Sequence, residues 1–182
     1  MLEDTQIIDI YLNGNREAFN ILIERYKTAL YRFCYHLTSN KQEADDLFQD
    51  TWVKAVEKIR QYDNSRAFNV WLFSIAMNNY RDKYRKAKRW LSKLTDVFGE
   101  NIQSEEPTAA EHVEDKEVKD LLVKCINELK DSYRIPLILY YYKEISYEDI
   151  AKILDIPLGT VKSRLNSAKK KLKEIMEVKG IE

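Results

Sequence analysis

Apolar residues recur at steps of three and four along much of this chain, which is the spacing of one face of an α-helix. The pattern is clearest between residues 16 and 37, at Phe19, Leu22, Ile23, Tyr26, Leu30, Phe33, Cys34 and Leu37. Similar spacing predicts helices over about 5–12, 41–61 and 68–91. Asn40, with Glu43 three residues later, is typical of a capping box before residue 41. The N-terminal half is therefore predicted to be helical.

The C-terminal half shows the same spacing in shorter segments. One apolar face is formed by Leu121, Leu122, Cys125, Ile126 and Leu129. Asp131 or Ser132 can cap the next helix, with Pro136 in or near its first turn. The apolar run "IPLILYYY" that contains Pro136 could be a strand or a buried helix, and its helical neighbours favour a helix.

Two further helices with a tight connection are predicted near the C-terminus. Ser146 is a favoured N-cap for the first of them. The segment "DIPLG" ends that helix, because Pro157 interrupts it and Gly159 permits unusual backbone angles. Thr160 can cap the second helix, whose buried positions step by four, three and four: Val161, Leu165, Ala168 and Leu172. This order of features predicts a helix-turn-helix.

Composition agrees with an all-α fold. The 182 residues include only 4 Gly and 3 Pro, too few for the turns of an all-β protein. No apolar run approaches the roughly 20 residues of a membrane span, and the N-terminus does not resemble a signal peptide, so we expect a cytoplasmic protein without membrane insertion. Cys34 and Cys125 lie among apolar residues, which favours buried free thiols over a disulfide or redox pair.

The net charge of zero conceals three segments of different sign. Residues 1–98 carry 16 basic and 13 acidic side chains, residues 99–120 carry 2 and 8, and residues 121–182 carry 12 and 9. A strongly basic cluster, "RDKYRKAKR", spans residues 81–89 and indicates a surface for a polyanion. The acidic middle also contains small and turn-forming residues, which predicts a flexible acidic linker over 96–114.

The last helix combines short and long donors on its open side. No carboxylate lies between Thr160 and Lys173, so nothing on that stretch would repel phosphates. Arg and Asn side chains can pair with base edges, whereas Lys mainly contacts phosphates. A merely soluble, lysine-rich helix is the alternative. The agreement of cap, turn and basic face in one order favours a helix lying in the major groove of DNA.

Enzyme chemistry finds no support in the sequence. There is no glycine-rich phosphate loop and no Cys/His set with metal-ligand spacing, so we expect no cofactor, no metal and no catalytic residue. His36 and His112 have no evident partner and are interpreted as structural or exposed. Acidic residues around 45–50 taken alone are typical of a solvated face near a helix N-terminus.

Three ordered motifs together resemble one protein family. They are "QEADDLFQDTWVKAVEKIRQYD" (42–63), "FNVWLFSIAMNNYRDKYRK" (68–86) and "YEDIAKILDIPLGTVKSRLNSAKKKLK" (147–173). The chain is similar to bacterial sigma factors of the extracytoplasmic function (ECF) type over residues 12–90 and 115–174. The resemblance implies two helical domains, 1–95 and 115–182, joined by the linker. It implies a subunit that binds core RNA polymerase, recognises −35 and −10 promoter elements and helps to melt the −10 region.

The resemblance assigns roles by position. Residues implied to bind polymerase are Asp45, Asp46, Gln49 and Asp50, which replaces the solvated-face interpretation of this acidic segment. Residues implied to bind −10 DNA are Tyr62, Asn64, Ser65, Arg66, Phe68, Asn78, Arg81, Lys83 and Arg85, with the segment 62–68 capturing an extruded base. Residues implied to bind −35 DNA are Thr160, Lys162, Ser163, Arg164, Asn166, Ser167 and Lys170.

The resemblance also implies an anti-sigma factor as a partner. Trp71 is interpreted as a core residue rather than a wedge that melts DNA. Ser74 and Asn166–Ser167 depart from the basic or aromatic residues common in the family, which affects the promoter sequence read rather than the polymerase role. A stand-alone helix-turn-helix regulator is the alternative function, although the acidic helix over 41–61 would have no use in it.

Overall fold

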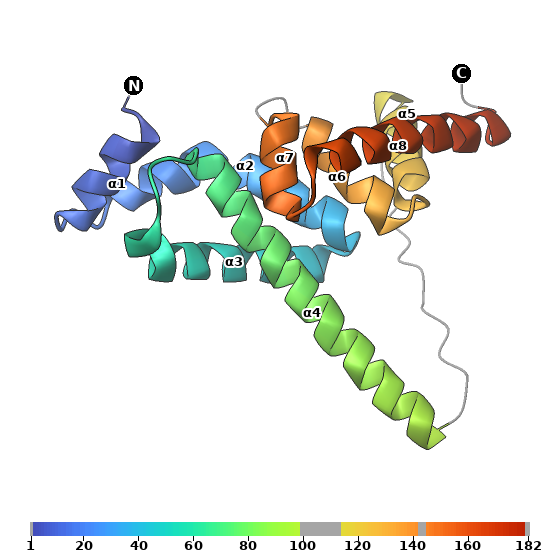
Figure 1. Cartoon of the computed structure of the whole chain (residues 1–182), viewed down its shortest axis with the longest axis horizontal. Coiled ribbons are helices and arrows are strands. Elements are labelled where there is room, and N and C mark those ends of the chain that lie inside the picture. Colours follow the sequence, from blue (N-terminus) through green and yellow to red (C-terminus); the bar gives the residue numbers. More distant parts are fainter. Residues whose placement is uncertain (1, 99–113, 142–144, 181–182) are drawn as a thin grey trace.

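The computed structural model describes residues 2–98, 114–141 and 145–180, with side chains for all of these except 85–98 and 114–120. Within these ranges every regular element is helical (Figure 1), which confirms the predicted all-α class. The elements are α1 (Asp4–Leu12), α2 (Ala18–Thr38), α3 (Lys41–Lys58), the short 3₁₀ helix η1 (Ile59–Gln61), α4 (Phe68–Phe98), α5 (Glu114–Asn127), α6 (Asp131–Tyr141), α7 (Tyr147–Leu154) and α8 (Leu158–Val178).

The N-terminal half packs four helices around one apolar core. Helix α2 contacts α1, α3 and α4, and α3 contacts α4. Most of the predicted inward face of α2 is buried, with Ile23 and Tyr26 half-buried against the core, and the side chain of Phe68 at the start of α4 is buried as well. The predicted cap of α3 is present, because the Asn40 side chain accepts a hydrogen bond from the backbone N–H of Glu43 at 3.0 Å. These contacts hold α3 and α4 side by side.

The C-terminal half is a smaller helical unit in which α8 packs on α6, α7 and α5. The apolar run after Asp131 forms the buried helix α6, as predicted, with Leu137 and Leu139 fully buried. Pro136 lies inside α6, early in its second turn, close to the first turn where it was predicted. Pro136 lacks a backbone N–H, so this turn has one hydrogen bond fewer than an ordinary helix.

Helix α4 is longer than the sequence pattern predicts. It continues to Phe98, seven residues beyond the expected end at 91, because no Gly or Pro occurs between 68 and 98 to end it. Figure 1 shows its C-terminal half extending past the packed helices. Most of the predicted linker over 96–114 lies outside the described residues, and the described part of the chain resumes with α5 at Glu114.

The two halves of the chain are packed against each other. Helix α4 contacts α7, and α2 contacts α6. Met77 of α4, Ile135 of α6 and Leu154 of α7 line the same groove at this contact, and each is less than 10% exposed. None of the helices described is long and apolar enough to cross a membrane.

Candidate protein and nucleic-acid interfaces

The helix-turn-helix predicted near the C-terminus is formed by α7 and α8. The hydroxyl of Ser146 accepts a hydrogen bond from the backbone N–H of Asp149 at 3.1 Å, so Ser146 caps α7 as predicted. The predicted buried positions of α8, from Val161 to Leu172, are all less than 10% exposed. They pack the helix against α6 and α7. The opposite side of α8 therefore faces away from the core.

The turn between α7 and α8 differs from the prediction. Asp155, not Gly159, adopts the left-handed conformation, with φ of 53°. Helix α8 already begins at Leu158, so Gly159 and Thr160 lie in its first turn and Thr160 is not the cap. The carbonyl of Pro157 accepts the N–H groups of Thr160 and Val161 at 2.9 and 3.1 Å. Proline at this cap leaves no backbone N–H in need of an acceptor, because its nitrogen carries no hydrogen.

The exposed side of α8 presents most of the residues predicted to bind −35 DNA. Lys162, Ser163, Asn166 and Lys170 are exposed, while Thr160, Arg164 and Ser167 are half-buried. Arg164 lies on the side toward α4 and lines the groove between the two halves. Lys169 is placed 4.7 Å from the ring centroid of Tyr140, a cation–π contact that holds it along the helix.

The predicted polymerase-binding residues of α3 divide into two sets. Asp45 is half-buried and accepts a hydrogen bond from the Tyr31 hydroxyl at 2.9 Å, which raises the pKa of Tyr31. Asp46, Gln49 and Asp50 are exposed. The structure therefore brings three of the four to one accessible face, which we call the acidic face of α3.

A lysine of α4 lies beside the acidic face of α3. Lys83 is 3.2 Å from a carboxylate oxygen of Asp50 and 4.0 Å from one of Asp46. Side chains at this contact are roughly half exposed, so each ion pair is weak and easily exchanged for another partner. The predicted polymerase-binding and −10 residues thus lie next to each other across two helices.

The segment predicted to capture a base is a compact loop between η1 and α4. The carboxylate of Asp63 accepts hydrogen bonds from the backbone N–H and the hydroxyl of Ser65 at 2.9 and 2.6 Å. These bonds lower the pKa of Asp63. The Tyr62 hydroxyl donates to the backbone carbonyl of Arg66 and closes the loop. Asn64 and Arg66 remain exposed at its tip.

The aromatic residues beneath this loop have different exposures. Phe68 is 1% exposed and packs against Tyr26, Tyr62 and Trp71, with ring centroids 5.5–5.8 Å away. Phe68 therefore has no surface for a DNA base, contrary to the prediction that it contacts DNA, and it supports the loop from below. The half-buried Trp71 packs against this cluster, in agreement with its interpretation as a core residue.

The face of α4 that follows the loop carries the remaining predicted −10 residues. Asn78 is exposed, whereas its neighbour Asn79 is 4% exposed. The Asn79 side chain accepts a hydrogen bond from Lys54 at 2.5 Å and lies 3.5 Å from the Thr51 hydroxyl, which fixes the rotation of α4 against α3. The Arg81 guanidinium donates to the Leu154 carbonyl at 2.6 Å. The side chain of Arg85 lies outside the described residues.

Sequence reasoning missed Asp63 and Arg134. The D-x-S pattern at 63–65 is a signal for the side-chain turn that Asp63 makes, so this role was detectable. Arg134 is only 7% exposed and donates to the carbonyl groups of His36 and Leu37 at 2.8 and 3.1 Å. Its partners are almost a hundred residues away in the chain, so no local pattern could reveal them.

Comparison with known families shows which protein family this chain belongs to. A model of sigma-70 region 2 matches residues 22–90, and a model of sigma-70 region 4 matches residues 119–172. The chain is 31% identical over 173 residues to the ECF RNA polymerase sigma factor SigW of Bacillus subtilis, covering 88% of this chain and 90% of that one. This chain belongs to the ECF family of RNA polymerase sigma factors.

Other relatives agree with this membership of the sigma factor family. The ECF sigma factor SigM of Bacillus subtilis is 36% identical over 154 residues, covering 85% of this chain and 92% of that one. Among solved structures, the sigma factor RpoE of Bartonella quintana, in complex with the anti-sigma factor NepR, is 31% identical with a TM-score of 0.74. That similarity covers 89% of this chain and 98% of the other, so it includes both halves.

Family membership indicates how the surfaces of this sigma factor are divided between its two regions. A sigma factor is the regulatory subunit that gives bacterial RNA polymerase its promoter specificity. Region 2 contains the acidic face of α3, the loop at 62–67 and the exposed side of α4, and region 4 contains the helix-turn-helix. Each region thus contains one of the surfaces that the sequence predicts to bind DNA, and region 2 also contains the acidic face of α3 that is predicted to bind polymerase.

Proposed function

We propose that this sigma factor binds core RNA polymerase through the acidic face of α3 and reads a promoter through two surfaces, one in each half. The observation that carries the proposal is the juxtaposition of opposite surface charges on region 2. Asp46 and Asp50 are exposed on α3, and the basic segment of α4 begins at Arg81, between three and four turns after Phe68 at the start of that helix. Acidic residues there suit a basic protein partner, since the same charges would repel DNA.

The −35 element is assigned to the exposed side of α8. Asn166 and Arg164 have the donors that base edges in the major groove accept, whereas Lys162 and Lys170 suit phosphates. Ser146 and Pro157 fix the ends of α7 and α8, so the exposed side has one orientation relative to its supporting helices. We therefore expect Arg164 and Asn166 to carry sequence preference and the lysines to carry affinity.

The −10 element is assigned to the loop at 62–67 and the adjoining side of α4. Asn64 and Arg66 provide polar groups for the edge of an extruded base, and Tyr62 provides an aromatic ring. The hydrogen bonds of Asp63 and Tyr62 hold the loop in one shape before DNA arrives, which lowers the entropic cost of binding. Asn78 and Lys83 extend this surface along α4, where Arg81 and Arg85 add positive charge.

The partners and setting follow from this assignment. We propose domains at 1–95 and 115–182, core polymerase and promoter DNA as binding partners, and an anti-sigma factor as inhibitor, as in the solved RpoE complex. The protein would act without an active site of its own, because the polymerase performs the chemistry. Its place would be the bacterial cytoplasm, where transcription occurs.

Transcription from core polymerase tests the proposed function. Core polymerase alone and core polymerase with this protein would transcribe the same library of genomic fragments, and the start sites would be mapped. The proposal predicts new starts that share two conserved blocks upstream. If no new starts appear while the protein alone binds one duplex sequence tightly, the chain acts as a stand-alone helix-turn-helix regulator instead.

A further inference from the structure

Two lysines of α8 are held over tyrosine rings of α6. The ammonium group of Lys169 lies 4.7 Å from the ring centroid of Tyr140, and that of Lys171 lies 5.7 Å from the ring centroid of Tyr133. Both distances allow a cation–π attraction, which extends to about 6 Å. Both lysines are exposed, whereas both tyrosines are half-buried. Neither lysine was among the residues predicted to bind −35 DNA.

The rings that hold these lysines are themselves fixed in place. Tyr140 packs against Tyr147 of α7, with ring centroids 5.4 Å apart, and both of these rings lie against the apolar core. Tyr133 also packs against the core. Each ammonium group is therefore restrained by a ring that belongs to the helices supporting α8.

The two lysines lie on opposite flanks of α8. Each residue turns an α-helix by about 100°, so residues two positions apart project about 200° from each other. Lys169 comes seven residues after Lys162, and Lys171 comes seven residues after Arg164, so each flank carries a row of two basic side chains. The exposed Asn166 projects between the two rows.

The spacing of the two tyrosines on α6 matches the width of α8. Tyr133 and Tyr140 are seven residues apart, which corresponds to about 10 Å along a helix axis. A helix with its side chains is about 10–12 Å across, and α6 packs directly on α8, so one ring reaches each flank. The major groove is about 12 Å wide and is bordered by a phosphate strand on each side. A helix lying in the groove thus turns one basic row toward each strand.

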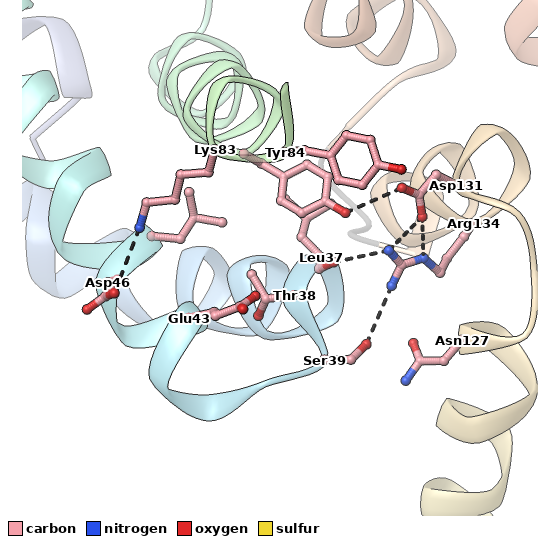
Figure 2. A pocket seen from close by; sticks show the side chains of 12 residues that line it. Leu37, Thr38, Ser39, Glu43, Asp46, Lys83, Tyr84, Asn127, Asp131 and Arg134 are labelled. Carbon is pink, nitrogen blue, oxygen red and sulfur yellow. Dashed lines mark hydrogen bonds and ion pairs between the residues drawn. The ribbon is translucent and has the colours of Figure 1, made fainter. Parts of the chain in front are cut away.

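No carboxylate has to be displaced from these two lysines. Figure 2 shows the contrasting case of Lys83 on α4, which extends to the Asp46 carboxylate and would have to leave it to bind a phosphate. Among the described ion pairs, neither Lys169 nor Lys171 has a carboxylate partner. A tyrosine ring carries no net charge, so it orders the side chain and leaves the positive charge for a phosphate. A side chain that is already ordered also loses less entropy when it binds.

We propose that Tyr133 and Tyr140 are positioning residues that hold Lys171 and Lys169 toward the two phosphate strands bordering the major groove. This inference rests on the proposed function, because the strands are within reach only if the exposed side of α8 lies in the groove. The tyrosines act through the lysines and do not contact DNA themselves. Phosphates carry no sequence information, so these contacts add affinity for any duplex.

The salt dependence of duplex binding by the full chain tests the role of the lysines. Anisotropy titrations would use one labelled duplex with the preferred −35 block and one with that block scrambled. Each phosphate contact changes the slope of log K against log salt by about 0.9, or about eightfold in affinity between 1 M and 0.1 M salt. Lys169→Ala and Lys171→Ala should therefore each bind both duplexes about eightfold more weakly than the parent chain at 0.1 M salt, and almost equally at 1 M.

A third lysine of α8 provides the matched control. Lys173 pairs with Glu177 at 3.6 Å, so its charge is already matched by a carboxylate on the same helix. Lys173→Ala should keep the salt slope of the parent chain.

Substitutions of Tyr140 separate positioning from a general effect on the fold. Tyr140→Leu leaves the charge of Lys169 in place and frees its side chain. It should weaken binding about two- to tenfold at every salt concentration, which corresponds to the cost of ordering one long side chain. Tyr140→Phe keeps the ring and should bind like the parent chain. Circular dichroism would confirm that these variants retain their helices.

A double-mutant cycle gives the decisive comparison. In a chain that already carries Lys169→Ala, Tyr140→Leu should have no further effect on binding, whereas general damage to α6 would weaken binding in either background. Tyr133→Leu with Lys171→Ala provides a second, independent cycle on the other flank of α8.

Several outcomes would overturn the proposal. They are an unchanged salt slope in both lysine variants, an equal change in Lys173→Ala, a Tyr140→Leu effect that persists in the Lys169→Ala chain, or no binding of the parent chain to either duplex. Equal affinity of the parent chain for the preferred and the scrambled duplex would instead refute the proposed −35 recognition. The salt slopes would in that case still decide whether the two lysines contact phosphates.

Discussion

Replacing Asp46 and Asp50 together with Asn removes two charges from the acidic face of α3 and keeps the size of both side chains. In the structure these carboxylates contact only Lys83 among the described ion pairs, at 4.0 and 3.2 Å, and all three side chains are roughly half exposed. Exposed pairs of this kind contribute about 0–1 kcal/mol to stability. The double variant should therefore unfold within a few degrees of the parent chain.

Binding to core polymerase should respond far more strongly than stability. If the acidic face of α3 lies at the centre of that interface, the loss should reach about 2–4 kcal/mol, which is the range of dominant interface residues. This corresponds to a Kd about 30 to 800 times higher. Titrating core polymerase into fluorescently labelled protein and following anisotropy measures the change. Electrostatic attraction also predicts a smaller difference between the two proteins at high salt.

A matched substitution on another helix makes this result specific. Glu24 on α2 is 67% exposed and forms a comparable surface pair with Lys27, so Glu24→Gln removes an acidic charge at a site with no assigned role. We expect Glu24→Gln to bind polymerase like the parent chain, and the double variant to bind isolated −35 duplex DNA like the parent chain. The reasoning is refuted if the double variant binds polymerase normally, or if it loses DNA and polymerase affinity equally.

Three further outcomes follow from individual contacts. Arg164→Ala should weaken binding to a preferred −35 duplex by about 1–3 kcal/mol and relax its sequence preference, whereas Lys170→Ala should weaken all duplexes equally and reduce the salt dependence; competition titrations that show the same uniform loss for both would contradict this. Asn79→Ala should lower the free energy of unfolding by about 2 kcal/mol, because it removes the hydrogen bond that the charged Lys54 donates to Asn79. If calorimetry shows the same melting temperature for this variant and the parent chain, that expectation is wrong. Burial, with Arg134 and Arg32 nearby, lowers the pKa of His36, so the neutral form is favoured in the folded chain. Stability from His36 is complete above about pH 6.5 and is lost as pH falls below it; melting curves should therefore decline more steeply from pH 7 to 5 for the parent than for His36→Gln, and parallel curves would exclude this role.

Periodicity was sufficient to predict the helices and their buried faces. The apolar steps of α2 and α8 report burial directly, because a helix that packs on one side needs apolar residues at that spacing. The conformation of the turn before α8 was harder to predict from the sequence. Pro157 and Gly159 both suggest a break, but a left-handed Asp155 satisfies the turn, and Gly159 is left in an ordinary helical conformation.

The parts of the candidate site that depend on the order of residues in a short segment could be predicted. The parts that depend on how helices pack could not. Motif positions indicated the acidic segment of α3 and the loop at 62–67, but they could not show that Phe68 is buried or that Asp45 turns toward Tyr31. Those outcomes depend on how α2, α3 and α4 rotate against one another. The Arg134 contact could not be predicted from any local pattern, because its partners, the carbonyl groups of His36 and Leu37, lie in the other half of the chain.

Footprinting at one mapped promoter tests the central claim that both DNA-facing surfaces act together on the polymerase. Permanganate would detect unpaired thymines near −10, and DNase I would detect protection at −35, with core polymerase, with this protein and with both. We expect −10 melting together with −35 protection only when core polymerase and this protein are both present, and loss of both signals with the Asp46→Asn, Asp50→Asn variant. Protection of both elements by the protein alone, or melting that survives this variant, would contradict it.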